Sequence, residues 1–206
     1  MRKKQLEIIL QRLASHPSPS PKLEQYMTPG DVAAALLYLA YVRGGIKDKV
    51  VYDLGCGTGR LAIGAALLGA REVVGVDIDQ RALKVAKQNA RRVDVEIRWV
   101  KQDVAELEAF GVDTVVQNPP FGVQRRGADM LFLQKALELA NEVYSLHKAT
   151  LQNREFIAKR VKEIGGKITD RVELSFQIPR QFDFHTHDTY RFRVDLYRIE
   201  RGGKDG

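Results

Sequence analysis

Two short motifs in this 206-residue chain have residue types and spacings that can do chemistry. The first is the range Asp53–Gly59, with the sequence DLGCGTG, in which glycines stand at alternate positions behind an acid. Glycines let a backbone turn tightly and approach a ligand closely. A dinucleotide-binding turn spaces its glycines as GxGxxG, so the alternate spacing disfavours NAD. The motif therefore predicts a loop, with Gly55 and Gly57 at its centre, that binds another nucleotide-like cofactor.

A second acid complements that loop. Asp77 closes the valine-rich segment 72–77, and an acid at the end of the second strand accepts hydrogen bonds from ribose hydroxyls in related nucleotide-binding folds. The pair favours cofactor binding over the alternative, a structural turn with incidental glycines. Cys56 lies inside the loop, and we expect a small packed residue rather than a nucleophile, because no histidine is near it in sequence.

The second motif is Asn118-Pro119-Pro120-Phe121, a turn rich in hydrogen-bond acceptors. Consecutive prolines fix the turn and remove two N–H donors, so the Asn118 side-chain oxygen and the Pro119 carbonyl can accept from one amino group. An exocyclic aromatic amine is a weak nucleophile because its lone pair is delocalised into the ring. Two acceptors off the ring plane localise that pair, and holding the nitrogen about 3 Å from an electrophile supplies the rest through orientation.

Phe121 offers a face on which a planar base can stack, a contact that contributes about 1 to 3 kcal/mol per base in nucleic-acid complexes. The alternative is a rigid turn with Phe121 in the core, since Asn-Pro is a common turn signal. The glycine loop and Asp77 precede the turn in the right order, so the reactive interpretation is favoured.

The elements that position these motifs follow from periodicity. From residue 49 onward, short β-rich segments alternate with helical ones, which implies right-handed crossovers and a parallel sheet. Two long alternating segments, 167–178 and 190–199, suggest an antiparallel pair at the sheet's edge. We predict a doubly wound α/β domain, with strands over 50–53, 72–77, 96–101, 112–117 and 142–146 and helices over 61–68, 80–91, 128–140 and 154–164.

Residues 1–48 form a predicted helical arm packed on the domain of residues 49–206. Leucine and isoleucine at helical spacing predict a helix over 1–14, and the prolines of 15–21 end it. A second helix is expected over 32–42, with Thr28 or Asp31 as its cap.

Composition limits the partners and the compartment. The net charge of +7 favours polyanionic partners. The single cysteine excludes an intrachain disulfide and a cysteine-rich zinc site, so a reducing, cytoplasmic location is expected. The longest apolar stretch, Val32–Val42, is shorter than the roughly 20 residues that span a bilayer, so no membrane association is expected.

The motifs together resemble one family along nearly the whole chain. The matching segments are Leu23–Tyr26 with Thr28, Asp53–Gly59, Asn118–Gly122, Gly127–Met130 and Val143–Lys148. They are similar to the methyltransferase-like protein five family, which comprises small-subunit rRNA adenine N6-methyltransferases. The resemblance implies a Rossmann-like class I methyltransferase fold whose mostly parallel, seven-stranded sheet has an antiparallel edge strand.

The same resemblance assigns roles to residues. It implies catalysis by Asn118, Pro119, Pro120 and Phe121, and contact with S-adenosylmethionine by Gln25, Thr28, Asp53, Gly55, Gly57, Asp77, Asp103 and Val104. Helix capping is the alternative for Thr28 and for Asp103. The resemblance also implies small-subunit rRNA as substrate and a small zinc-binding activator protein, for which an exposed sheet edge is a candidate docking place.

RNA contacts are expected at Arg125 and Arg126, beside the catalytic turn, with basic residues of the arm at positions 3, 4, 12 and 22 as further candidates. The tail loop 183–188 is less basic than an rRNA-binding segment should be. It contains His185 and His187, which we interpret as solvated residues, so we predict no metal site.

Other functions stay open at this point. The acceptor turn fits any planar amino group, including guanine N2 in RNA or a glutamine amide of a protein. A different class of function is an inactive methyltransferase fold that binds RNA as an assembly factor. This alternative is disfavoured by the intact glycine loop, Asp77 and Asn118.

Overall fold

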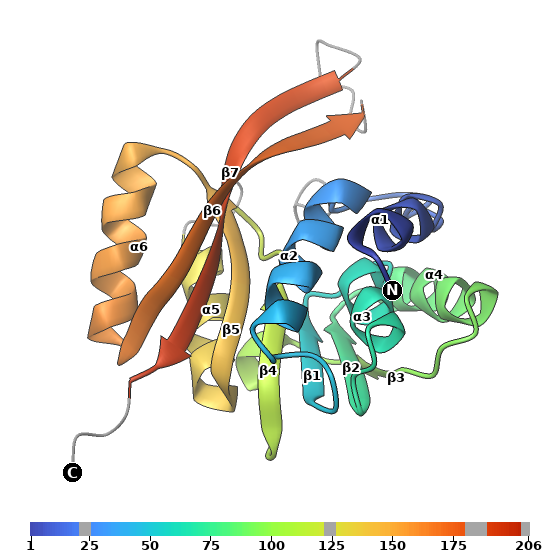
Figure 1. Cartoon of the computed structure of the whole chain (residues 1–206), viewed down its shortest axis with the longest axis horizontal. Coiled ribbons are helices and arrows are strands. Elements are labelled where there is room, and N and C mark those ends of the chain that lie inside the picture. Colours follow the sequence, from blue (N-terminus) through green and yellow to red (C-terminus); the bar gives the residue numbers. More distant parts are fainter. Residues whose placement is uncertain (21–25, 122–126, 180–188, 203–206) are drawn as a thin grey trace.

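The structure is a computed structural model, and it describes residues 1–20, 26–121, 127–179 and 189–202. In the described residues two helices come first, strands and helices then alternate from β1 to β6, and β7 follows β6 (Figure 1). In order, they are α1 (Lys3–Gln11), α2 (Gly30–Val42), β1 (Val50–Leu54), α3 (Arg60–Leu67), β2 (Glu72–Asp77), α4 (Gln80–Arg92), β3 (Arg98–Lys101), the 3-10 turn η2 (Val104–Glu106), β4 (Val112–Gln117), α5 (Ala128–Leu139), β5 (Ala140–Lys148), α6 (Leu151–Glu163), β6 (Gly166–Pro179) and β7 (Thr189–Arg201).

The strands form one sheet in the order β3-β2-β1-β4-β5-β7-β6. Strands β1 to β5 pair in parallel, and β7 runs antiparallel to both of its neighbours. This confirms the predicted doubly wound fold, including the antiparallel pair at the sheet's edge. Strand β6 is the edge strand, and β7 returns between it and β5. The strand order reverses between β1 and β4, and ligands of such sheets bind in the crevice outside that point.

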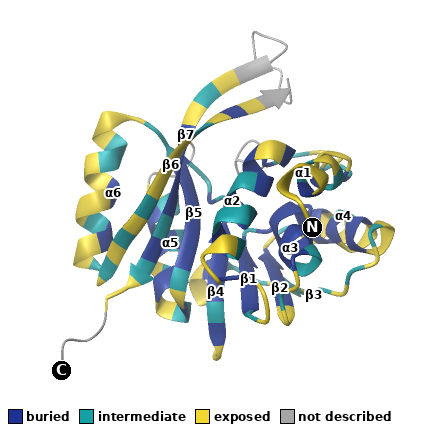
Figure 2. Cartoon of the chain, viewed as in Figure 1, coloured by how far each residue is buried: buried dark blue, intermediate teal, exposed yellow. Residues whose placement is uncertain are grey.

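Buried side chains divide between the two faces of the sheet. Along β1, Val51 packs with residues of α1, α2 and α3, whereas Val50 and Tyr52 pack with residues of α5 and α6. This alternation follows from the two-residue period of a strand that has helices on both faces. Figure 2 shows the resulting layer of buried strands between the more exposed helices.

The N-terminal arm is docked on the domain. Leu6 and Leu10 of α1 are fully buried in the same cluster as the strands. Asn89 of α4 accepts a hydrogen bond from the Ala14 N–H at 2.9 Å and donates to the Ala14 carbonyl at 3.0 Å. Gly30, the first residue of α2, donates its N–H to the Gln11 side chain. The arm therefore adds its apolar face and its backbone hydrogen bonds to the glycine-loop side of the fold.

The predicted cap of α2 is wrong. Pro29 is the N-cap, and no side chain caps this helix. The Thr28 hydroxyl instead has a partner 90 residues away in the chain, at the end of β4. In the described part of the chain, no helix combines the length and apolarity needed to cross a bilayer.

Candidate active site

The glycine loop leaves β1 and enters α3, and its residues Gly55 and Gly57 are half-buried. Gly57 has a φ of +53°, and a Cβ at this position would meet no atom within 4 Å. By contrast, a Cβ on Gly55 would lie 2.9 Å from the Phe132 ring, so that glycine is required by packing. The open space at Gly57 fits a loop whose backbone approaches a cofactor.

Asp77 ties β2 to this loop. Its carboxylate accepts the Gly57 N–H at 2.7 Å on one oxygen and the Asp79 N–H at 2.8 Å on the other. Burial raises the pKa of Asp77, and the two N–H groups oppose that rise. A carboxylate has about four acceptor positions, so each oxygen can accept a further bond from a ribose hydroxyl. Contact of Asp77 with a ribose stays a prediction.

Asp53 serves the loop from the other side. Gly59 is the N-cap of α3 and has no side chain that could accept a backbone N–H of the first turn. Asp53 fills this capping role, because it accepts the Ala62 N–H at 2.9 Å. A carboxylate at a helix N-terminus satisfies an unpaired donor and interacts favourably with the helix dipole. Asp53 is only 1% exposed, and burial raises its pKa to about 8. Burial also raises the pKa of the Cys56 thiol well above its usual value, which agrees with a packed rather than a nucleophilic role.

Asn118 is held in one orientation. Its amide nitrogen donates to the Thr28 hydroxyl at 2.9 Å, while its side-chain oxygen is buried and has no partner among the described residues. Thr28 is itself held, because the buried guanidinium of Arg60 donates to its carbonyl. A buried acceptor without a donor costs about 1 to 3 kcal/mol. An amino group of a bound substrate would remove that cost, and the prolines at 119 and 120 offer no competing N–H.

Phe121 packs more closely than an open stacking platform would. Its ring meets Phe176 of β6 and Phe192 of β7 edge to face, at centroid distances of 5.9 and 5.5 Å. The Lys148 ammonium lies 5.9 Å from its centroid. The alternative of a packed Phe121 is therefore borne out in part, since the ring is partly buried against the main apolar cluster. Stacking on a target base stays a prediction.

Asp103 caps the turn that follows β3. Its carboxylate accepts the Ala105 N–H at 2.9 Å, and Val104 is buried. The capping alternative for Asp103 is confirmed, and the contact of Asp103 and Val104 with an adenine stays a prediction. Three predicted site residues, Gln25, Arg125 and Arg126, lie outside the described residues, as do position 22 and the two tail-loop histidines.

A buried polar cluster beneath the Asn118 turn was missed as a site feature. Gln117 donates to the Ser145 hydroxyl at 3.0 Å, and that hydroxyl lies 2.8 Å from His147 Nε2. The remaining ring nitrogen of His147 is 3.7 Å from Asp129, in the first turn of α5. The signal was the polar pair at alternate positions of a strand whose neighbours are apolar. The cluster joins the ends of β4 and β5 to the start of α5, and so supports both ends of the loop that carries the turn.

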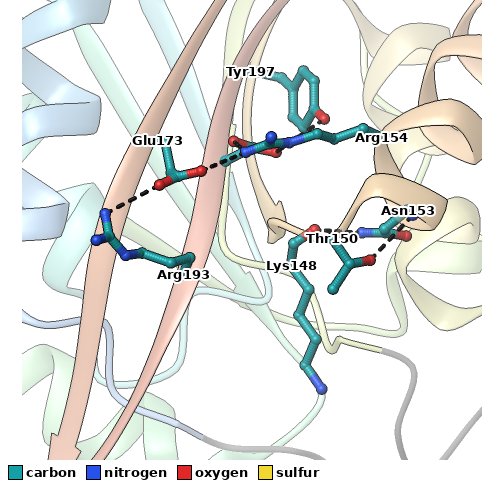
Figure 3. A network of polar contacts seen from close by, with 8 residues as sticks. Lys148, Thr150, Asn153, Arg154, Glu173, Arg193 and Tyr197 are labelled. Carbon is teal, nitrogen blue, oxygen red and sulfur yellow. Dashed lines mark hydrogen bonds and ion pairs between the residues drawn. The ribbon is translucent and has the colours of Figure 1, made fainter.

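A second polar network joins helix α6 to strands β6 and β7 (Figure 3). Arg154 of α6 makes a two-pronged contact with the buried Asp195 of β7, at 2.6 and 2.8 Å, and also reaches Glu173 of β6. Glu173 in turn accepts from Arg193. These contacts fix α6 against β6 and β7 close to Lys148, which contacts Phe121.

Comparisons with known proteins agree with this geometry. The family model described as "Methyltransferase small domain" matches residues 30–148. The METTL5 protein of Danio rerio, named an rRNA N(6)-adenosine-methyltransferase, is 38% identical over 97% of this chain and 99% of its own length. The uncharacterized protein MJ0284 of Methanocaldococcus jannaschii is 39% identical over 98% of this chain and 96% of its own.

Solved structures give the same result. The crystal structure of PH1948 from Pyrococcus horikoshii is 44% identical, covers 98% of both chains and has a TM-score of 0.92. Identity and fold therefore extend along the arm, the domain and the final hairpin together. With the family model matching more than half of the chain and a named relative matching nearly all of it, the protein belongs to the METTL5 family of methyltransferases.

Proposed function

We propose that this protein transfers a methyl group from S-adenosylmethionine to the N6 amino group of an adenosine in small-subunit rRNA. The observation that carries the proposal is the amide of Asn118, whose nitrogen is occupied by Thr28 and whose buried oxygen lacks a donor. The bond to Thr28 turns the amide nitrogen toward the arm and leaves the side-chain oxygen, an acceptor, available to an amino group. An amino group that is to receive a methyl group needs such a hydrogen-bond acceptor beside it.

The chemistry of the turn needs no strong base. The Asn118 oxygen and the Pro119 carbonyl draw the amino nitrogen toward a tetrahedral geometry and localise its lone pair. S-adenosylmethionine supplies, when bound, an electrophilic methyl group on a sulfonium. The new bond joins that carbon to N6, the carbon–sulfur bond breaks with its electron pair left on sulfur, and N6 loses one proton. Orientation of the two reacting atoms supplies the remaining acceleration.

The residues around the glycine loop fit the cofactor. Gly57 leaves open space for it, and Asp77 keeps acceptor positions for ribose hydroxyls. Asp53 places a carboxylate near the loop, where positive charge of the cofactor's amino-acid end would be balanced. The choice of adenosine in rRNA is supported by the relatives of this family that bear that name. The small subunit is the choice that the family resemblance implies.

The test is transfer of labelled methyl from S-adenosylmethionine to purified small-subunit rRNA and, in parallel, to protein, followed by nucleoside analysis. N6-methyladenosine is the expected product. N2-methylguanosine or labelled glutamine would contradict the proposed adenosine substrate. The absence of label in both the RNA and the protein fractions would contradict the proposed methyl transfer. Asn118→Ala should abolish transfer and leave cofactor affinity within a few fold, whereas Asp77→Ala should weaken cofactor binding first. Equal loss of affinity in both variants would contradict the roles.

The proposal includes the small zinc-binding activator protein that the resemblance implies. The sheet ends at β3 on one side and at β6 on the other, and an edge strand offers unpaired backbone groups to a partner. Such a protein, when co-expressed, should copurify with the chain and raise its thermal stability. Unchanged stability without copurification would remove the activator from the proposal and leave the methyl transfer untouched.

A further inference from the structure

Helix α4 carries five basic side chains and no acidic one. These residues, Arg81, Lys84, Lys87, Arg91 and Arg92, are all exposed, and we refer to them as the α4 face. The net charge of the whole chain is +7. A helix of 13 residues therefore carries five positive charges that no acid of the same helix balances.

Only one cation of the α4 face pairs with an acid among the described residues. Arg81 lies 3.9 Å from Asp79. Within the ranges that the structure describes, the other four cations form no ion pair. Helix α6 shows the opposite arrangement, since its cations at 154, 159 and 160 all pair with carboxylates. Among the described residues, three of the four cations of α6 thus pair with carboxylates, whereas on α4 only Arg81 does.

The stability of the helix explains only part of this pattern. Arg91 and Arg92 lie in the last turn, where the helix dipole favours cations. Arg81 lies in the first turn, where the dipole disfavours them. Lys84 and Lys87 are three residues apart, and Lys87 and Arg91 are four apart, which are the spacings at which like charges repel across a helix surface. The first half of the face therefore opposes helix formation, and a bound polyanion would relieve that repulsion.

Helix α4 is also joined to the glycine loop and to the arm. The helix has Asp79 as its N-cap, two residues after Asp77, the acid proposed to bind ribose. Asn89 on the same helix bonds to both backbone groups of Ala14 in the arm and donates to the Thr58 carbonyl in the glycine loop at 3.0 Å. Arg12, the exposed C-cap of α1, precedes Ala14 by two residues.

We propose that the α4 face binds the phosphate backbone of the RNA substrate whose base is methylated at the candidate active site. The inference rests on the proposed RNA substrate, and it names the surface that holds that substrate. Contacts of lysine and arginine to phosphates release counterions and fix the position of a nucleic acid without reading its sequence. The face therefore contributes affinity and orientation, while Asn118 and its turn act on the base.

The test compares two charge reversals of equal size. One variant carries Lys84→Glu, Lys87→Glu and Arg91→Glu. The control carries Lys159→Glu, Lys162→Glu and Lys167→Glu, three exposed lysines of α6 and the start of β6. Binding of a small-subunit rRNA fragment is measured across salt concentrations, together with KM and kcat for methyl transfer and the affinity for S-adenosylmethionine.

We expect the α4 variant to flatten the slope of log affinity against log salt by about 0.7 to 0.9 for each phosphate that the protein no longer neutralises. Its KM for RNA should rise at least tenfold, with cofactor affinity unchanged and the control close to wild type. An α4 variant that matches the control in slope and KM would overturn the inference. So would an α4 variant that still binds RNA but no longer binds an acidic partner protein. Wild-type protein that binds RNA through α4 but transfers no methyl would instead overturn the proposed function.

A neutral variant guards against misfolding. The triple change Lys84→Ala, Lys87→Ala and Arg91→Ala removes the like-charge pairs while it keeps good helix formers. This variant should melt at or above the wild-type temperature in low salt and still show the flatter salt slope. A stable variant with the wild-type slope would overturn the inference.

Discussion

The burial of Asp53 predicts how cofactor binding depends on pH. Its pKa in the folded protein is about 8, against about 3.9 for an aspartate in water. Between about pH 4 and pH 8 the unfolded chain has released this proton and the folded chain keeps it. The free energy of unfolding of the free protein therefore falls as pH rises through that window. Since one pKa unit corresponds to about 1.4 kcal/mol, the cost of ionising Asp53 is of the order of several kcal/mol.

A cation bound near Asp53 favours its ionised form, so cofactor binding should release the proton. With a pKa of about 8, roughly nine in ten molecules hold the proton at pH 7, by the ordinary titration relation. Binding at pH 7 should then release close to one proton from this group, and binding at pH 9 should release almost none. The affinity for S-adenosylmethionine should rise by up to about tenfold per pH unit below pH 8 and level off above it.

Isothermal titration calorimetry in buffers of different ionisation enthalpy counts those protons. The control is Asp53→Asn, in which the amide oxygen can still accept the Ala62 N–H. The amino group of the cofactor titrates equally with both proteins and cancels in the difference. Without cofactor, Asp53→Asn should also have a higher free energy of unfolding than the wild-type protein at pH 8. Equal proton counts in both proteins, or a wild-type affinity that falls from pH 6 to pH 8, would refute the reasoning.

Three further predictions follow from single contacts. Thr28→Val removes the acceptor that orients the Asn118 amide and should lower kcat about tenfold, which corresponds to one net hydrogen bond. Thr28→Ser should restore kcat, and the cofactor affinity of both variants should stay within a few fold of wild type. Asn89→Ala leaves backbone groups of the arm and the glycine loop unpaired, so the melting temperature should fall and amide exchange at residue 14 should accelerate. Arg154→Met leaves a buried carboxylate without its partner and should lower the denaturation midpoint far more than Arg160→Met, which breaks a surface pair.

The sequence predicted the sheet well where its strands are buried on both faces. Strands β2 and β4 have the predicted bounds, 72–77 and 112–117, because uninterrupted valine-rich runs between glycine or polar turns fit little else. Strand β5 is longer than predicted, Ala140–Lys148 rather than 142–146. Ser145 and His147 look like solvent-facing residues in the sequence, but Gln117 from the neighbouring strand satisfies the serine in the interior. A long-range partner of this kind is not visible in local periodicity.

Helix starts show the same limit. Helix α6 begins at Leu151 rather than at residue 154, because Thr150 caps it by accepting the Asn153 N–H at 3.2 Å. That capping signal is local and could have been found in the sequence. At α2 the same rule failed, since the Thr28 hydroxyl turns away from its own helix toward Asn118. A residue that is suited to capping and does not cap can bind another partner, and here that partner is the proposed amine acceptor.

The contacts of Thr28 also explain why the arm belongs to the candidate active site. Arg60, in the first turn after the glycine loop, donates to the Thr28 carbonyl, and the Thr28 hydroxyl accepts from Asn118. The loop that is proposed to hold the cofactor and the turn that is proposed to hold the amine are thus joined through one residue of the arm. Arg60 is buried, and burial lowers its pKa to about 10, so it stays charged at neutral pH. A change at Arg60 should therefore lower kcat through Asn118 even where cofactor affinity is preserved, whereas a change at Asp77 should act on affinity first.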